Sequence, residues 1–545
     1  MFTQIGPDLG SSLFKEDAFL SGLTKRYLTE DAYVLMLPKL LALGEDIPNR
    51  VRLWGDDAEK KPPQIENYDA FGHRVDRLLL PHGWLRLKKF AHQNRLVGIG
   101  YDKKLRKQGR IAQAVAQVMF SAYSSTYSCP LAMTDGAVKL LQEHAPKSIK
   151  DSMVPLFLGK EEEMIATCGQ WMTERIGGSD LRHIECVATL ARKEEDKELY
   201  RLYGLKWFAS AIDSEYALVL AQIPEHGPSL FLLPVWSKSG LSEGVRIDRL
   251  KNKLGTRGLP TAEVRLEGAL ATLIGPKGRG IHASTPLLTI TRFYNALASA
   301  SIMSRAQSLV TSYAKVRESF GKPIGQHILH NKTLADLDAK RCGAVALCFE
   351  IARLMGENED GAPKDKEARL MRALIPLAKM VLGKWAVLFA SDAMEAMGGV
   401  GYLEDTEFPK LLRDAQVLPI WEGTTNMMLL DIIRAQNKDN ALVVLLKDLC
   451  ERANGIMIDE SDALRVLKQR LSQVSERIML AVHKSDGDCS IYLEPIMRKS
   501  AFLIAACAMA VLLAEAKPFI IEHDAFAQAR FTTFVENNLC GNFSL

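Results

Sequence analysis

The spacing of apolar residues constrains the fold most, and it changes twice along the 545-residue chain. From about residue 14 to 165, apolar residues recur every three or four positions, as in "AYVLMLPKLLAL", which is the period of an amphipathic helix. From about 166 to 280 they form short runs such as "YALVLAQI", bounded by Gly, Pro, Asp and Ser, as strands do. From about 285 the helical spacing returns. The pattern predicts helical, β and helical parts in that order.

The length of the chain and its polar breaks predict how these parts divide into domains. At ~150 residues per domain, the chain is long enough for three or four packed units. Polar interruptions such as "NGIMIDESD" and "HKSDGDCS" mark a last helical block. In chain order, the predicted domains are an N-terminal segment with a helical domain at 1–165, a β domain at 166–284, a helical bundle at 285–439 and an extra helical domain at 440–545.

Several features of the sequence favour a cytoplasmic protein without a membrane span. The first twenty residues lack the basic and apolar regions of a signal peptide. The longest apolar stretch, residues 501–514, is shorter than the ~18 residues that a membrane-spanning helix needs, so it is more typical of a buried core helix. The nine cysteines form no C-x-x-C pair and have no zinc-type spacing with histidines, so they are expected to be reduced thiols and no metal is predicted.

Two segments of the β part suit a bound cofactor. In "MTERIGGSD", Met172–Asp180, the glycine pair lets the backbone approach a polar or anionic ligand closely, although an ordinary turn is the alternative. In "GLKWFASAI", the ring of Trp207 or Phe208 could cover a planar cofactor while Ser210 bonds its polar edge. The alternative for these aromatic residues is to fill the core of the β domain.

The segment "VLPIWEGTTNMMLLDIIR", residues 417–434, contains a candidate base. It places Glu422 between a tryptophan and a glycine, at the end of one apolar run and before a helix-like one. A carboxylate there is either a base in a dry pocket or a residue that ends a turn or caps a helix. The residues alone leave both interpretations open.

Two further segments carry weaker signals. The stretch "RESFGKPIGQ" ends a helical pattern with Arg317 and Phe320 three residues apart, which predicts that both lie on one helical face. The stretch "MGGVGY" could bring backbone amides to a phosphate through Gly398, Gly399 and Gly401, but a glycine cluster alone is a weak signal.

Six motifs, in this order, resemble those of the flavin-dependent acyl-CoA dehydrogenases. They are "MTERIGGSD", "KWFAS", "KLGTRG", "RESFGKP", "AMGGVGY" and "IWEGTTN", and the resemblance covers about residues 60 to 440. The additional N-terminal segment and C-terminal block resemble the AidB-like branch of that family. The resemblance implies an α+β, acyl-CoA dehydrogenase-like fold with an N-terminal helical domain, a central β-barrel-like domain, a C-terminal four-helix bundle and an extra C-terminal helical domain.

The resemblance also implies an enzyme, an FAD-dependent acyl-CoA dehydrogenase of fatty acid metabolism. Glu422 matches the catalytic base, which removes the α proton of an acyl-CoA thioester while the β hydride passes to flavin N5. A carboxylate in a dry pocket has a raised pKa and is a stronger base than in water. Some members keep the base immediately before an arginine on another helix, but here Thr291 precedes Arg292 and cannot serve.

The cofactor contacts implied by the resemblance come from several segments. The matched FAD-binding positions are Gln170, Met172, Thr173, Ser179, Phe208, Ser210, Arg317, Phe320, Gly398, Gly399, Gly401, Ile420, Trp421, Gly423, Thr424 and Asn426. Arg317, Phe320 and the three glycines match positions that reach the FAD of a neighbouring subunit, so a homotetramer, a dimer of dimers, is expected. Arg175, Ile176 and Ala211 depart from the commoner family pattern near the flavin. The electron acceptor is not indicated.

The AidB-like branch leaves a second interpretation open, namely a flavin-carrying protein of the alkylation response that binds acyl-CoA or DNA with little turnover. DNA binding would need a basic face. Residues 441–545 contain eleven Lys or Arg against thirteen Asp or Glu, which favours a solvated helix face, although the stretch 465–484 is locally basic. The run 84–110 is more basic. Solubility or intramolecular pairing is its simplest role, and contact with coenzyme A phosphates or with DNA is the alternative.

Overall fold

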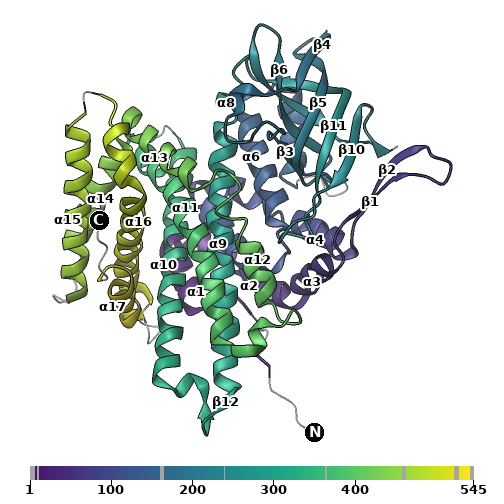
Figure 1. Ribbon diagram of the computed structural model, residues 1–545. Coiled ribbons are helices and arrows are strands. Elements are labelled where there is room, and N and C mark those ends of the chain that lie inside the picture. The colour runs from purple at the N-terminus through teal and green to yellow at the C-terminus, as the bar shows by residue number, and fades with distance from the viewer. Residues whose placement is uncertain are drawn as a thin grey trace, which may run out of the picture. The chain divides into compact units, whose positions relative to one another are not determined.

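The computed structural model describes the chain except residues 1–5, 9–11, 160–164, 238–239, 362–364, 457–461, 486, 521–526 and 541–545 (Figure 1). Contacts within the chain define two compact units. The β unit consists of Arg50–Tyr101 and Tyr123–Tyr294. The helical unit consists of Met1–Asn49, Asp102–Ala122 and Asn295–Leu545. Each unit therefore joins segments that are far apart in the sequence.

A barrel-like sheet forms the centre of the β unit (Figure 1). Its strands are β3 (Cys168–Trp171), β4 (Val187–Glu194), β5 (Lys197–Ser210), β6 (Tyr216–Ile223), β7 (Gly227–Pro234), β10 (Val245–Leu250) and β11 (Thr261–Ile274). They follow the order β10-β11-β5-β4-β6-β3, and β7 pairs with both β11 and β6. Because β7 bridges two strands of this path, the sheet closes on itself. The predicted β-barrel-like domain is confirmed.

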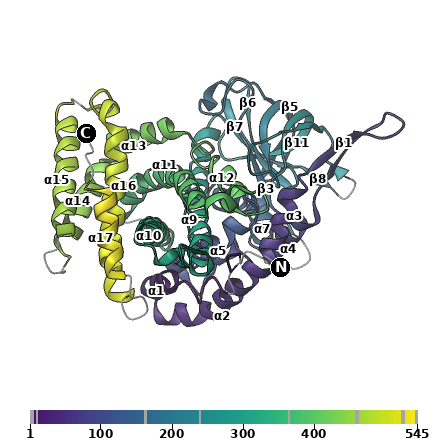
Figure 2. The same ribbon diagram turned by 60° about the horizontal axis from the view of Figure 1, so that its bottom comes forward.

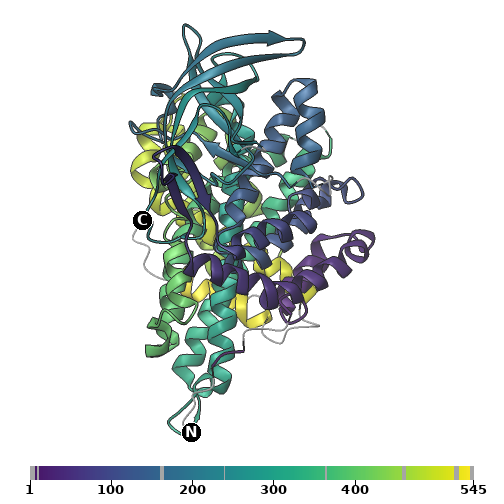
Figure 3. The ribbon, with the colours of Figure 1, turned by 90° about the vertical axis from the view of Figure 1, so that its right-hand side faces the viewer.

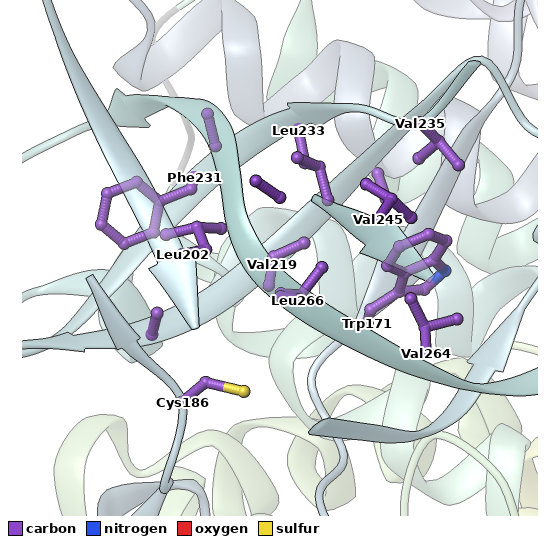
Figure 4. Close-up of a cluster of buried hydrophobic side chains, with 14 of the residues drawn as sticks. Trp171, Cys186, Leu202, Val219, Phe231, Leu233, Val235, Val245, Val264 and Leu266 are labelled. Atoms are coloured by element: carbon purple, nitrogen blue, oxygen red, sulfur yellow. The ribbon is translucent and has the colours of Figure 1, made fainter. Parts of the chain in front are cut away.

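Apolar side chains fill the interior of this sheet (Figure 4). Trp171, Phe231 and Leu266 are each at most 2% exposed. Strand β6 contributes every second residue, Ala217, Val219 and Ala221, because side chains of a strand alternate between its two faces. Full burial of a large apolar side chain stabilises a protein by about 1.5–3 kcal/mol, so this cluster is what makes the β unit a rigid support for its loops.

The β unit also contains helices, which the apolar spacing of residues 14–165 predicts, and a hairpin, which it does not predict. The helices include α3 (Arg52–Lys60), α4 (His82–Gln93), α6 (Ser128–His144) and α7 (Lys147–Phe157). Residues 64–79, assigned to the helical part, instead form an antiparallel hairpin of β1 (Gln64–Tyr68) and β2 (Arg74–Leu79), seen in dark purple in Figure 3. Buried Asp76 holds it to β10, because its carboxylate accepts hydrogen bonds from Asn67 Nδ2 at 2.8 Å and from the Ile247 amide at 3.2 Å. Side-chain hydrogen bonds to β10, together with Ile65 and Leu78, which pack against the core of the β unit, hold this hairpin.

Long helices form the helical unit. They are α1 (Ala18–Tyr27), α2 (Glu30–Asp46), α5 (Gly109–Phe120), the part of α9 (Thr285–Val316) that begins at Asn295, α10 (Ile328–Glu359), α11 (Asp365–Ala396), α12 (Phe408–Ala415) and α13 (Thr425–Asp439). Helix α11 packs against α10, α12 and α13. This arrangement confirms the predicted helical bundle.

The last hundred residues form four further helices in the same unit. They are α14 (Ala441–Asn454), α15 (Asp462–His483), α16 (Ser490–Ile520) and α17 (Ala527–Asn538). Helices α14, α16 and α17 pack against α10 or α13, and α15 packs on the outer side of these three helices (Figure 2). Ion pairs join them to the bundle, since Arg452 of α14 contacts Glu350 of α10 at 2.9 Å and Glu515 of α16 at 2.7 Å. The extra C-terminal helical block is therefore packed onto the bundle.

Two helices of this unit, α11 and α16, are long and apolar enough by composition to cross a membrane. In each, 78% of the most apolar window is buried inside the protein. Burial of this extent is typical of the core helices of a folded protein.

Candidate active site

The predicted ligand loop of the β unit, Met172–Asp180, is a tight turn that follows β3. Glu174 and Gly177 exchange backbone hydrogen bonds of 3.2 and 3.1 Å, and the Trp207 amide donates to the Thr173 carbonyl at 3.0 Å. A Cβ atom at Gly178 would lie 2.8 Å from Thr173 Oγ1, so only glycine fits there without a shift. The turn thus places Thr173 beside the start of the "WFAS" segment, as the two motifs together predict.

A buried ion pair joins this loop to strand β5. Lys206 Nζ of β5 lies 2.6 Å from Glu174 Oε1, and the two side chains are 0% and 1% exposed. Lys206 also donates to the Leu220 carbonyl at 2.6 Å, and Glu174 accepts from the Cys186 amide at 3.3 Å. Burial alone would raise the pKa of Glu174, but the Lys206 ammonium and these hydrogen bonds hold that pKa below its usual value. The motifs of the sequence assign no role to either residue, although a lysine inside a strand-like apolar run is a visible signal.

The end of β5 presents an exposed aromatic ring. The Phe208 side chain is 52% exposed, whereas Trp207 is half-buried. Lys251 Nζ lies 3.3 Å from the centroid of the Trp207 ring and 4.9 Å from that of the Phe208 ring. Ser210 is tied to the neighbouring strands, because its carbonyl accepts from Trp171 Nε1 at 3.1 Å and its hydroxyl lies 3.2 Å from Thr261 Oγ1. Of the two predicted aromatic residues, Phe208 is the one available to cover a planar ligand.

Strand β3 contributes an unsatisfied polar atom next to this region. Gln170 Oε1 is buried and has no hydrogen-bond partner within the described residues. The next residue but one, Met172, is buried, and Ser179 at the far end of the loop is exposed. A buried acceptor without a partner costs free energy unless a ligand or water donates to it. A planar ligand with N–H donors, such as the flavin ring of FAD, fits these groups.

Glu422 lies in the helical unit, in the loop 416–424 that joins α12 to α13. Its φ angle is +58° and that of Gly423 is +110°, so the chain is left-handed at both residues. Such a conformation is uncommon for a residue with a side chain and is found preferentially at functional sites. Thr424, rather than Glu422, is the N-cap of α13. The interpretation of Glu422 as a helix cap is therefore wrong.

Two buried side chains hold the loop around Glu422. Asn295 Nδ2 of α9 donates to the Leu418 carbonyl at 3.0 Å, and Lys379 Nζ of α11 donates to the Gly423 carbonyl. Nearby, Trp421 Nε1 is buried and lacks a partner among the residues that the structure describes. The remaining predicted positions of this segment, Ile420, Thr424 and Asn426, are exposed. The loop therefore combines a fixed backbone with several side chains open to a ligand.

Arg317 and Phe320 do not lie on a helical face, so that prediction is wrong. Helix α9 ends at Val316, and the two residues lie in the turn formed by β12 (Glu318–Ser319) and β13 (Lys322–Pro323). Gly321, with a φ angle of +80°, and the proline cannot continue the helix. The Phe320 side chain is 94% exposed. In Figure 1 this turn lies at the far end of α9 and α10 from α13.

The predicted glycine cluster forms a short 3-10 turn, Gly398–Tyr402, after α11. Gly398 has a φ angle of +66°, and a Cβ atom at Gly401 would lie 2.4 Å from the Met394 carbonyl. Gly399 has open space around its Cα atom. Two of the three glycines are thus required by the backbone itself, whether or not a phosphate approaches them.

Basic residues of the run 84–110 form ion pairs within each unit. In the β unit, Lys88 Nζ lies 2.6 Å from Glu215 Oε1. In the helical unit, Arg110 is 1% exposed and donates to both carboxylate oxygens of Glu359 at 2.8 and 3.0 Å. These contacts favour intramolecular pairing as the role of this run.

Comparison with known proteins covers almost the whole chain. Residues 4–160 match the N-terminal domain of the adaptive response protein AidB. Residues 169–269 match the middle domain of acyl-CoA dehydrogenases, and residues 278–436 match their C-terminal domain. Acyl-CoA dehydrogenase family member 11 of Caenorhabditis elegans is 38% identical over 94% of this chain and 85% of its own length. This chain belongs to the acyl-CoA dehydrogenase family.

Other relatives support the same assignment. The putative acyl-CoA dehydrogenase AidB of Escherichia coli is 34% identical over 77% of this chain and 78% of its own length, which confirms the AidB-like branch. The crystal structure of Caenorhabditis elegans ACDH-11 in complex with C11-CoA aligns over 99% of this chain and 93% of that chain, with 35% identity and a TM-score of 0.91. The family acts on acyl-CoA thioesters with FAD as cofactor, so this member is an FAD-dependent oxidoreductase.

Proposed function

We propose that this protein oxidises an acyl-CoA thioester at its α and β carbons, with Glu422 as the base that takes the α proton. The observation that carries this proposal is the left-handed backbone of Glu422 in a loop held from two helices. Strain of this kind persists only where the surrounding structure fixes it, and it is typical of functional residues. Of the two alternatives, the cap role belongs to Thr424, and a turn role is distinguished from that of a base by the Glu422→Gln variant below.

The residues of the loop support proton abstraction in two ways. Glu422 is half-buried, and an ionised carboxylate held at one place in a ligand site can accept a proton from the α carbon. The fixed backbone keeps the carboxylate in one place, so less entropy is lost when the carboxylate and the α carbon of the substrate come together for proton transfer. When bound, FAD supplies the acceptor for the hydride that leaves the β carbon.

The remaining site residues are proposed to hold the cofactor. Support from the β unit is the exposed Phe208 ring, the unpartnered Gln170 Oε1 and the tight turn at Thr173. We propose further FAD contacts from Met172, Ser179, Ser210, Ile420, Trp421, Gly423, Thr424 and Asn426, the positions that match the motifs of the family. We propose that Arg317, Phe320 and the glycines at 398, 399 and 401 reach the FAD of a second copy in a homotetramer. The 94% exposure of Phe320 supports that assignment.

Glu422→Gln tests the proposed base. The amide has nearly the same shape but cannot take a proton, so the variant should bind FAD and acyl-CoA as the wild type does while anaerobic bleaching of the flavin stops. Because the worm ACDH-11 was crystallised in complex with C11-CoA, that thioester is the first ligand to try, followed by shorter and branched chains. Bleaching of the Glu422→Gln flavin at the wild-type rate would contradict the assignment.

The AidB-like match favours one alternative, a flavin-carrying protein that binds acyl-CoA or DNA with little turnover. The locally basic stretch 465–484 gives DNA little support. Arg470 donates to the Leu539 carbonyl at 2.8 Å and Arg465 pairs with Asp462 at 2.9 Å, so both serve contacts within the chain. Absence of bleaching by every acyl-CoA tried, together with a DNA gel shift at about 0.15 M salt, would favour the alternative.

The proposed location is the cytoplasm, without a membrane span. The nine cysteines, all within the described residues, are free thiols, as expected of a reducing compartment. The two apolar helices are mostly buried inside the protein. Fractionation of cells that express a tagged protein tests this location, and recovery with membranes after a salt wash would contradict it.

A further inference from the structure

Lys379 is a fully buried cation in contact with the loop that carries Glu422. It lies in the middle of α11, its side chain is 0% exposed, and its Nζ donates to the Gly423 carbonyl. One turn further along α11, Gly383 lies against the same loop. A Cβ atom there would be 3.2 Å from the Leu418 carbonyl and 3.3 Å from the Pro419 nitrogen. The face of α11 at 379 and 383 therefore supports both ends of the loop.

Packing alone does not require a charge at this position. Burial of an ammonium group is costly, and an apolar side chain of similar length would fill the same space at lower cost. A hydrogen bond from a charged donor is roughly twice as strong as one between neutral groups. The cation is therefore suited to fix the carbonyl that it contacts, which belongs to the residue immediately after Glu422.

The geometry of the loop shows what this contact restrains. Glu422 and Gly423 have φ angles of +58° and +110°, and a relaxed chain would leave the first of these readily. A bond to the Gly423 carbonyl fixes the 423–424 peptide plane, which is one plane beyond the plane that follows the Glu422 Cα atom, so it restricts rotation at Gly423 and, through it, at Glu422. Asn295 restrains the start of the loop at Leu418, but it is neutral and its contact lies four residues from Glu422.

We propose that Lys379 is a positioning residue, which holds Glu422 in the left-handed conformation that presents its carboxylate to the acyl-CoA. The inference rests on the proposed role of Glu422 as the base. It assigns Lys379 no contact with the substrate. Because a misplacement of about 1 Å lowers a rate by about 100-fold, loss of the Lys379 contact should slow proton abstraction by roughly 10- to 100-fold.

The test compares Lys379→Met with wild type and with Lys384→Met, which changes a half-exposed lysine of the same helix. Lys379→Met should keep its FAD, and its Kd for C11-CoA should stay within about twofold, while anaerobic flavin bleaching slows by roughly 10- to 100-fold. Lys379→Arg, which keeps the charge, should recover part of the rate. Lys384→Met should match the wild type in all measurements.

Two further measurements separate positioning from a general structural role. Hydrogen–deuterium exchange of the flavin-free protein should be faster in peptides that cover 417–424, with α11 itself unchanged. An acyl-CoA analogue with sulfur in place of the β carbon cannot lose a hydride, so its α-hydrogen exchange with D2O reports proton abstraction alone. That exchange should slow by the same factor as bleaching.

Each outcome has a defined meaning. The inference is overturned if Lys379→Met bleaches its flavin and exchanges its loop amides at the wild-type rates. It is also overturned if both Lys379→Met and Lys379→Arg lose the fold or the FAD, since that would show a structural role. Glu422→Gln, measured in parallel, distinguishes the two claims. If the flavin of Glu422→Gln bleaches at the wild-type rate, the proposed base is wrong. If the flavin of Glu422→Gln does not bleach but that of Lys379→Met bleaches at the wild-type rate, only the positioning role is wrong.

Discussion

Breaking the ion pair between Lys206 and Glu174 should destabilise the β unit and release its FAD. Both side chains are at most 1% exposed, so Lys206→Met leaves a carboxylate buried without its counter-charge. Removal of one partner of such a pair costs about 3–5 kcal/mol. For a unit of about 220 residues, 1 kcal/mol corresponds to roughly 2–4 °C, so its Tm should fall by roughly 6–20 °C.

A double variant shows whether the pair itself is responsible. Glu174→Gln with Lys206→Met leaves no uncompensated charge, so it should be more stable than Lys206→Met alone. Thermal unfolding followed by circular dichroism gives the Tm values, and the visible flavin absorbance gives FAD occupancy. Lys147→Met, which removes an exposed lysine paired with Asp151 in α7, should leave the Tm unchanged. Additive effects of the two single changes would refute the argument.

The same pair predicts a pH dependence with a definite sign. The pKa of Glu174 lies below its usual value in the folded protein, so the folded state binds fewer protons there than the unfolded state. Its stabilisation is therefore complete above the unfolded pKa of about 4.3 and is lost as the pH falls through the folded pKa. The Tm difference between wild type and Glu174→Gln should shrink in acid. A difference that grows in acid would contradict this sign.

Two further predictions concern single positions. Gly178→Ala places a Cβ atom 2.8 Å from Thr173 Oγ1, so the turn must shift at a cost of about 1–3 kcal/mol, and FAD binding measured by titration of the flavin-free protein should weaken. Unchanged FAD affinity would show that the turn does not contact the cofactor. Phe320→Ala removes a ring that is 94% exposed, so each subunit should keep its fold, as circular dichroism reports, while light scattering shows fewer tetramers and absorbance shows less FAD. A full tetramer with full FAD would refute the proposed contact between copies.

The periodic parts of the fold could be predicted from the sequence, and the short irregular parts could not. The strand and helix periods indicate the β domain and the long helices, because burial of one face sets those periods. The hairpin of β1 and β2 is too short and too polar for its period to stand out in the sequence, and Asp76 and Asn67 hold it through hydrogen bonds with Ile247 of β10. The apolar pattern predicts helix at Arg317 and Phe320 because it continues up to them, whereas Gly321 and the proline at 323 end the helix.

The residues proposed for the site come from ordered motifs, whereas the buried residues that support its loops were missed for a common reason. Glu174 and Lys206 are 32 residues apart, and Lys379 and Gly423 are 44 apart, so no local pattern joins the partners. Each lysine interrupts an apolar run, in "GLKWFAS" and in "PLAKMVLG". A charged side chain is costly at a position that the spacing of apolar residues assigns to the core, unless it is paired. Such a residue therefore indicates a partner elsewhere in the chain, although the sequence does not identify that partner.

The two buried lysines support their loops in different ways, so the same substitution should have different effects. Lys206 neutralises a buried carboxylate, and Lys206→Met leaves that charge uncompensated, which affects folding and FAD binding first. Lys379 donates to the Gly423 carbonyl, and Lys379→Met leaves that acceptor unsatisfied in the loop that carries Glu422, which affects the position of Glu422 first. Lys206→Met should lose stability but keep its rate per bound flavin, which would show that the loop at Glu174 is fixed to bind the cofactor. Lys379→Met should lose rate but keep its flavin, which would show that the loop at Glu422 is fixed to place the base.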